Sequence, residues 1–310
     1  MNEPLQLKLD AGFSLGGEAS LHVAASVWLP ADPAPASTLL VCLPGGNMNR
    51  RYYDLRPPDD AADHSFSFAA QMTARGFIVA ALDHLGLGDS SKPQDCWQLT
   101  ADVLVRANAA ATAQLQARLR EGRLAPGVAA LPQLRSIGVG HSMGAMLTIL
   151  QQAATRTHDA IVLLGFSTRG LPEYLPPALK ELADPVALRP QLVEHARRMF
   201  GQAYPVIHRG GGNNTELFGS GKAEPRGIAA LKAATDCLLP LPGLMSMLPG
   251  NVAAEAAMLD VPVFLGIGER DMVGPPHRVP AAFTGSRDIT LYLLPETGHS
   301  HFLFPARTAL

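Results

Sequence analysis

The sequence has few cysteines and few charged residues. Cys42, Cys96 and Cys237 are widely spaced and include no C-x-x-C pair, so neither a disulfide framework nor a zinc site is expected. Charged residues make up 17% of the chain, against about 25% in an average soluble protein. Lys plus Arg (25) nearly balance Asp plus Glu (27), and without a basic excess we expect no nucleic-acid partner.

Long hydrophobic runs are also missing. No stretch approaches the roughly 18–20 apolar residues that cross a bilayer, and the first residues lack a basic start followed by an apolar run. We therefore expect no transmembrane segment, no secretory signal and a cytoplasmic location. The 47% hydrophobic content exceeds that of disordered chains, and the dilute charge indicates a large interior or an apolar cleft.

Eight runs have the pattern of β-strands. Residues 5–9 and 21–29 alternate in polarity around Gly16 and Gly17, which predicts an antiparallel pair at a sheet edge. Six continuous apolar runs are typical of parallel strands buried on both faces: 38–43, 77–82, 136–139, 160–165, 261–267 and 289–294. Helical segments at 67–75, 100–120 and 143–155 lie between them, so the alternation predicts an α/β fold with a mostly parallel sheet.

The pattern changes between residues 168 and 259. This segment has many prolines, a glycine tract at 210–212, and helical fragments at 177–183 and 191–200, without a convincing strand. We interpret it as a helical cap inserted into a core formed by residues 1–167 and 260–310. Its stretch LLPLPGLMSML (238–248) is too apolar for an ordinary surface loop. It is expected to be the core of the cap, to line an apolar pocket, or to join copies in a homo-oligomer.

The strongest motif is G-x-S-x-G at residues 140–144, between a predicted strand and a predicted helix. A serine at such a turn projects its hydroxyl from the sheet, and the glycines leave room because they lack a Cβ. A dinucleotide fingerprint would need glycine where Met143 stands. A phosphate loop ending at Gly221-Lys222 would need Gly at position 216 and Ser or Thr at 223, so no nucleotide site is expected.

With this motif the chain resembles the α/β-hydrolase family, in which the nucleophile is followed by the acid and then the histidine. Asp271 and His299 each follow a predicted strand, 28 residues apart. The resemblance implies that Ser142 is the nucleophile, His299 the base and Asp271 the acid. His301 is the main rival for the base, but His299 directly follows a glycine as in the family motif. His301 is expected to pack against or cap the last short segment.

Two further segments resemble family motifs. Residues 43–47 (LPGGN) occupy the position of the oxyanion loop, with Pro44 in place of the commoner histidine. The resemblance implies that the N–H groups of Gly46 and Met143 bind the oxyanion, with Asn47 as second choice. Residues 83–90 (DHLGLGDS) resemble a structural turn of the family. Arg50 and Arg51, shortly after the segment 43–47, are expected to be a solvated pair of loop charges.

The resemblance implies acyl transfer to water on a hydrophobic carboxylic ester. A lactonase is the nearest alternative, and thioesterase, carbon–carbon hydrolase and a receptor-like binding module rank lower. A hydrophobic small molecule is the expected partner, without a metal or organic cofactor, because His299-x-His301 is an isolated pair of ligand-type residues. The residues expected to line the substrate pocket are Asn47, Tyr53, Leu241, Met245 and Leu248.

Overall fold

The computed structural model describes residues 3–17, 20–33, 37–180, 184–206 and 222–310, and its centre is an eight-stranded sheet. The strands, in the order in which they lie in the sheet, are β1 (Leu5–Asp10), β2 (His22–Trp28), β4 (Ile78–Leu82), β3 (Thr38–Leu43), β5 (Arg135–His141), β6 (Ala160–Leu164), β7 (Val263–Gly268) and β8 (Ile289–Leu294). The pairings β1–β2 and β2–β4 are antiparallel, and all others are parallel. The predicted α/β fold and the antiparallel pair at one edge are confirmed.

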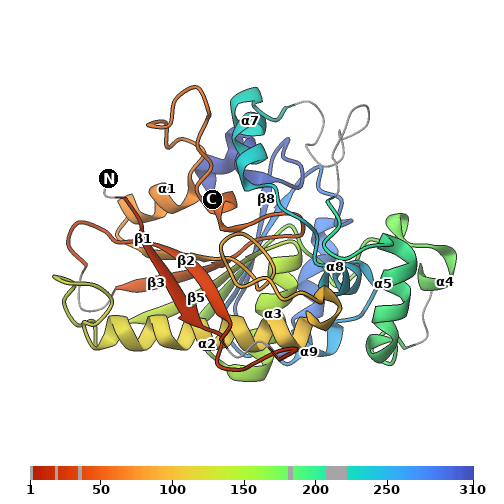
Figure 1. Cartoon of the computed structure of the whole chain (residues 1–310). Helices are drawn as coiled ribbons and strands as arrows, with labels where there is room; N and C mark the ends of the chain where they lie inside the picture. Colours follow the sequence, from red (N-terminus) through yellow and green to blue (C-terminus); the bar gives the residue numbers. More distant parts are fainter. Residues whose placement is uncertain (1–2, 18–19, 34–36, 181–183, 207–221) are drawn as a thin grey trace.

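Helices cover both faces of this sheet (Figure 1). They are α1 (Phe68–Ala74), α2 (Ala101–Arg120), α3 (Met143–Thr155), α4 (Pro177–Lys180), α5 (Leu192–Phe200), α7 (Pro225–Ala234), α8 (Pro240–Met247) and α9 (Ala253–Ala257). Within β3, Leu39 and Val41 belong to the apolar cluster with α2 and α3, whereas Leu40 and Cys42 belong to the cluster with α1 and α7. Because alternate side chains enter opposite cores, the central strands are apolar throughout.

Strand β8 departs from the expected burial on both faces. It lies at the sheet edge with only β7 beside it, and its residues are partly or fully exposed until the buried Leu294. Leu293 is 47% exposed. A continuous apolar run therefore predicted the strand but not its place at the edge, because an edge strand can be as apolar as a central one.

The segment between β6 and β7 contains α4, α5, α7, α8 and α9, and no strand lies in its described part. The helix expected at 177–183 is described as α4 to Lys180, while residues 181–183 and the glycine tract at 210–212 lie outside the described residues. The division into a core and a cap at residues 168 and 259 stays a prediction. Within the described ranges, no helix has both the length and the apolar character needed to cross a membrane.

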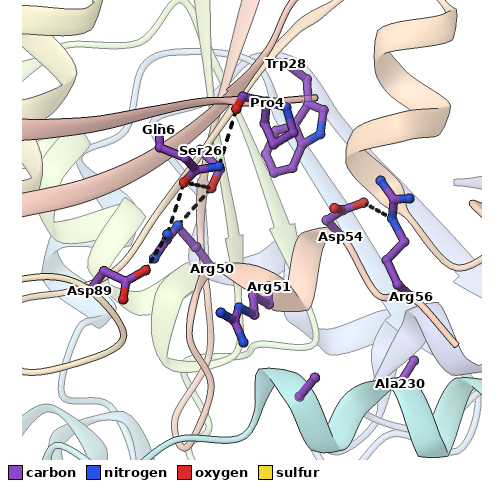
Figure 2. A pocket seen from close by; sticks show the side chains of 11 residues that line it. Pro4, Gln6, Ser26, Trp28, Arg50, Arg51, Asp54, Arg56, Asp89 and Ala230 are labelled. Carbon is purple, nitrogen blue, oxygen red and sulfur yellow. Dashed lines mark hydrogen bonds and ion pairs between the residues drawn. The ribbon is translucent and has the colours of Figure 1, made fainter. Parts of the chain in front are cut away.

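Arg50 is buried rather than solvated, which corrects the expectation for the arginine pair. Its guanidinium bonds to the fully buried carboxylate of Asp83, to Asp89 at 2.6 Å and to Ser26 at 2.8 Å. Arg50 and Arg51 both line a hollow of about 440 Å³. Figure 2 shows their side chains there, and Arg51 is exposed. The buried carboxylate of Asp83 requires a partner of opposite charge, and the guanidinium of Arg50 is that partner.

We predict that Arg50→Leu lowers the free energy of unfolding by about 3–5 kcal/mol, because it leaves the Asp83 carboxylate buried and unpaired. Urea unfolding followed by circular dichroism measures the change. Arg51→Leu, at the adjacent exposed position, is the matched control and should leave the midpoint nearly unchanged. Equal midpoints for the two variants would contradict the prediction.

Candidate active site

Ser142 lies at the sharp turn between β5 and α3. Its backbone has φ 54° and ψ −121°, a conformation that is unfavourable for any residue with a side chain. A Cβ at Gly144 would lie 2.1 Å from the carbonyl oxygen of Leu43, and one at Gly140 would lie 2.4 Å from the Cα of Ala145. Both glycines are therefore required sterically, and they let the turn hold Ser142 at the carboxyl end of the sheet.

The structure brings the three predicted side chains together at this edge. The Oγ of Ser142 lies 2.9 Å from Nε2 of His299, whose Nδ1 lies 2.8 Å from Oδ1 of Asp271. Because a carboxylate only accepts, Nδ1 carries the proton and the Nε2 lone pair faces the serine hydroxyl. The Asp271 side chain is fully buried and the His299 ring is nearly so. The arrangement can take a proton from Ser142 and stabilise the resulting imidazolium.

The rival acids do not reach this site. The carboxylate of Glu269 accepts a hydrogen bond from the backbone N–H of Glu296, and Asp260 pairs on the surface with Arg156 at 3.5 Å. In the described ranges, neither carboxylate bonds to an imidazole. Asp271 is thus the acid that the described residues place against His299.

Gly46 and Met143 flank Ser142 in the same cavity. Among the described residues, the N–H of neither one donates a recorded backbone hydrogen bond, so both donors are available to a bound oxygen. The loop passes close to the serine turn, because a Cβ at Gly45 would lie 2.9 Å from Nδ1 of His141. Pro44, in place of the commoner histidine, keeps its carbonyl as an acceptor and leaves the glycine donors in position.

Comparison with known proteins places the chain in a family. The model of the alpha/beta hydrolase family matches residues 40–309. The chain belongs to the alpha/beta hydrolase family. A search of curated protein sequences finds no significant match.

Several solved structures superpose on this alpha/beta hydrolase over nearly its whole length. An esterase from Exiguobacterium antarcticum has a TM-score of 0.61 at 13% identity, covering 96% of this chain and 94% of its own. A bromoperoxidase from Bacillus anthracis has 0.59 at 12% identity, with coverages of 96% and 93%. A proline iminopeptidase from Mycobacterium smegmatis has 0.58 at 16% identity, with coverages of 96% and 92%. At identities of 12–16%, the structural likeness establishes the fold alone.

In this member of the alpha/beta hydrolase family, Ser142 lines a cavity of about 390 Å³. The apolar side chains of its wall are Met48, Met143, Leu171, Met199, Phe200, Leu238, Met247 and Met272. No Lys, Arg, Asp or Glu side chain lines it among the described residues. Methionine is unbranched and polarisable, so this wall can adapt to differently shaped apolar groups. The cavity favours an uncharged ligand.

Only one of the five expected pocket residues lines this cavity, namely Asn47. Tyr53 is fully buried in the core, where its hydroxyl donates to the carbonyl of Leu43 at 2.8 Å. Leu241 and Met245 line a separate hollow of about 310 Å³ beside the start of α2, and Leu248 is buried without lining either hollow.

The physical reason is the helical turn of α8. Gly243, Ser246 and Met247 face the cavity, whereas Leu241 and Met245 face away from it. The apolar stretch 238–248 therefore serves both the interior and the cavity wall. Its side chains are mostly buried within the chain, and association of copies through it stays a prediction.

His301 is fully buried in the last segment, in agreement with the expected packing, and its ring also makes a contact that the sequence did not predict. Its Nε2 lies 3.0 Å from Oδ2 of Asp271, the oxygen that His299 does not use. Burial alone would raise the pKa of Asp271, but the two imidazoles beside it hold that pKa well below its usual range. In the sequence, the only indication of this contact is the spacing of His299 and His301, which places both rings near the same strand end.

Two more buried histidines support the site. His141 donates from Nε2 to the carbonyl oxygen of His299 at 2.8 Å, and burial holds its pKa well below the usual value. His84 donates from Nε2 to the carbonyl of Pro44 at 3.0 Å, and burial lowers its pKa too. Both rings are therefore neutral at pH 7. The sequence showed His84 only as part of a structural turn, because its contact with Pro44 is made 40 residues away.

Proposed function

We propose that this protein is a serine hydrolase that cleaves a carboxylic ester of an uncharged, hydrophobic small molecule. The observation that carries the proposal is the continuous hydrogen-bond chain from Ser142 through His299 to Asp271, opening into an apolar cavity. A nucleophile, its base and a group that orients the base are the parts that acyl transfer requires. The esterase among the superposed structures is consistent with the proposal.

In the proposed reaction, His299 takes the hydroxyl proton of Ser142 while Oγ forms a bond to the ester carbonyl carbon. The N–H groups of Gly46 and Met143 stabilise the negative oxygen of the tetrahedral intermediate. His299 then gives its proton to the leaving alkoxide, which departs as the alcohol and leaves an acyl-enzyme. Water, deprotonated by His299, attacks the acyl carbon, and the acid leaves as Ser142 recovers its proton.

The segment 168–259 supplies much of the cavity wall, including Leu171, Met199 and Met247. This supports its proposed role as a cap over the site. A cavity of about 390 Å³ lies at the small end of ligand pockets, which are commonly about 300–1,000 Å³. We therefore propose short to medium acyl chains rather than long ones.

The uncharged wall yields a prediction on matched substrates. We expect p-nitrophenyl butyrate to be hydrolysed with a kcat/KM about 10- to 100-fold higher than p-nitrophenyl hemisuccinate, whose terminal carboxylate would have to leave water without a partner charge. Release of nitrophenol, corrected for spontaneous hydrolysis, measures both rates. Equal values for the two esters would contradict an apolar acyl site.

Lactone hydrolysis is the alternative with the same chemistry, since the ester of a ring is opened by the same attack. Ring-opening rates on hydrophobic lactones, compared with open-chain esters of equal carbon number, distinguish the two activities. A binding module that kept the same residues would turn over once or not at all. A burst of one product equivalent per protein without a steady phase would identify that case.

A further inference from the structure

We propose that His301 is a positioning residue that holds the Asp271 carboxylate in the orientation that His299 requires. The inference rests on the proposed function, because it concerns the base of that reaction. Oδ1 of Asp271 lies 2.8 Å from Nδ1 of His299, and Oδ2 lies 3.0 Å from Nε2 of His301. Because each carboxylate oxygen is hydrogen-bonded to a different imidazole, the carboxylate cannot rotate freely about the Cβ–Cγ bond.

Few donors reach the Asp271 carboxylate. Its side chain is fully buried, and in the described part of the chain the donors to its oxygens are the two imidazoles, without a backbone N–H, lysine or arginine. Gly165, at φ 58°, allows this close packing, since a Cβ there would lie 3.1 Å from Oδ2. Because a buried carboxylate needs hydrogen bonds to remain ionised, the bond from His301 carries much of that requirement.

His301 acts as a fixed donor and not as a second base. Its ring is fully buried, and its Nδ1 has no recorded partner among the described residues. A proton on Nδ1 would therefore be buried without an acceptor, which favours the tautomer with the proton on Nε2. The titratable groups facing it are Asp271, His299 and His141, whose ring centroid lies 5.8 Å away. The hydroxyl of Ser142 bonds to His299 instead.

Removing this donor has a definite consequence for pH dependence. Oδ2 of Asp271 would become a buried acceptor without a partner, so the carboxylate would hold a proton, or an adjacent imidazolium, more tightly. The pair formed by Asp271 and His299 would then take up a further proton at higher pH. Since the reaction needs His299 unprotonated, the acid limb of kcat/KM would move to higher pH.

The test compares His301→Gln with His301→Met. Gln can place an amide N–H near the position of the ring Nε2, whereas Met has similar length and no donor. For His301→Met we expect kcat to fall about 10- to 100-fold with little change in KM, and the acid limb to move to higher pH. His301→Gln should recover much of kcat and return the acid limb toward the unmodified position.

The outcomes are separable from those of the proposed function. If Ser142→Ala abolishes activity while His301→Met keeps the unmodified pH profile, the positioning role is wrong and the proposed function stands. If Ser142→Ala remains active, the proposed function itself fails. Should His301→Met not fold, His301→Asn replaces it, because its amide is too short to reach Oδ2. An Asn variant with the same acid limb as the Gln variant would then overturn the inference.

Discussion

Replacing Ser142 by Ala is expected to lower kcat for ester hydrolysis by about 10⁴- to 10⁶-fold. The change removes only Oγ, which lies 2.9 Å from Nε2 of His299, and it creates no new contact in the turn. Without the oxygen no acyl-enzyme can form, and the remaining groups can only polarise a bound ester. Initial rates on p-nitrophenyl butyrate measure the loss, and thermal melting checks that the fold is retained.

Ser246→Ala is the matched control for this prediction. Ser246 lines the same cavity, but its hydroxyl donates to the carbonyl of Gly243, and among the described residues it has no histidine partner. The variant should keep nearly full activity and should still be labelled by a fluorophosphonate, whereas Ser142→Ala should not be labelled. Labelling of Ser142→Ala, or activity within tenfold of the unmodified protein, would exclude Ser142 as the nucleophile.

Asp271→Asn is expected to lower kcat by about 10⁴-fold. Both His299 and His301 direct an N–H toward the carboxylate, which accepts on each oxygen. An amide accepts on one side and donates on the other, so one imidazole must turn a lone pair toward it. If that ring is His299, its proton moves to Nε2, and the ring can no longer accept the proton of Ser142.

Asp260→Asn and Glu269→Gln are the controls, since these acidic residues are near in sequence and lie outside the hydrogen-bond chain. Each should retain kcat within a few fold. Stopped-flow measurement of nitrophenol release separates acylation from deacylation, and both should slow in Asp271→Asn because His299 serves in each step. A full rate in Asp271→Asn with a loss in Glu269→Gln would reassign the acid.

Local patterns predicted the elements that depend on nearby residues. The turn around Ser142 could be predicted because a strand, two sterically required glycines and a helix are contiguous in the chain. Asp271 and His299 could be predicted because each follows a strand, and the carboxyl ends of parallel strands meet at one edge. The family resemblance supplied their order, which the residues alone did not.

Long-range contacts were the source of the errors. Arg50 reads as a loop charge until Asp83, from the end of another strand, is seen buried against it. Leu241 and Met245 were predicted to line the cavity beside Ser142, but they lie on the opposite face of α8 and line a different hollow. An apolar composition reports that a residue avoids water, and it does not report which of several interiors the residue enters.

The sequence by itself determined the α/β alternation, the serine turn and the residue types of the proposed reaction, because these follow from periodicity, steric limits and chain order. Only the tertiary structure decided that His301 shares the carboxylate of Asp271, that His84 holds the carbonyl of Pro44, and that methionines surround Ser142. These features are contacts between side chains whose direction depends on how the elements pack. Spacing along the chain limits which residues can meet, and packing selects the atoms that do.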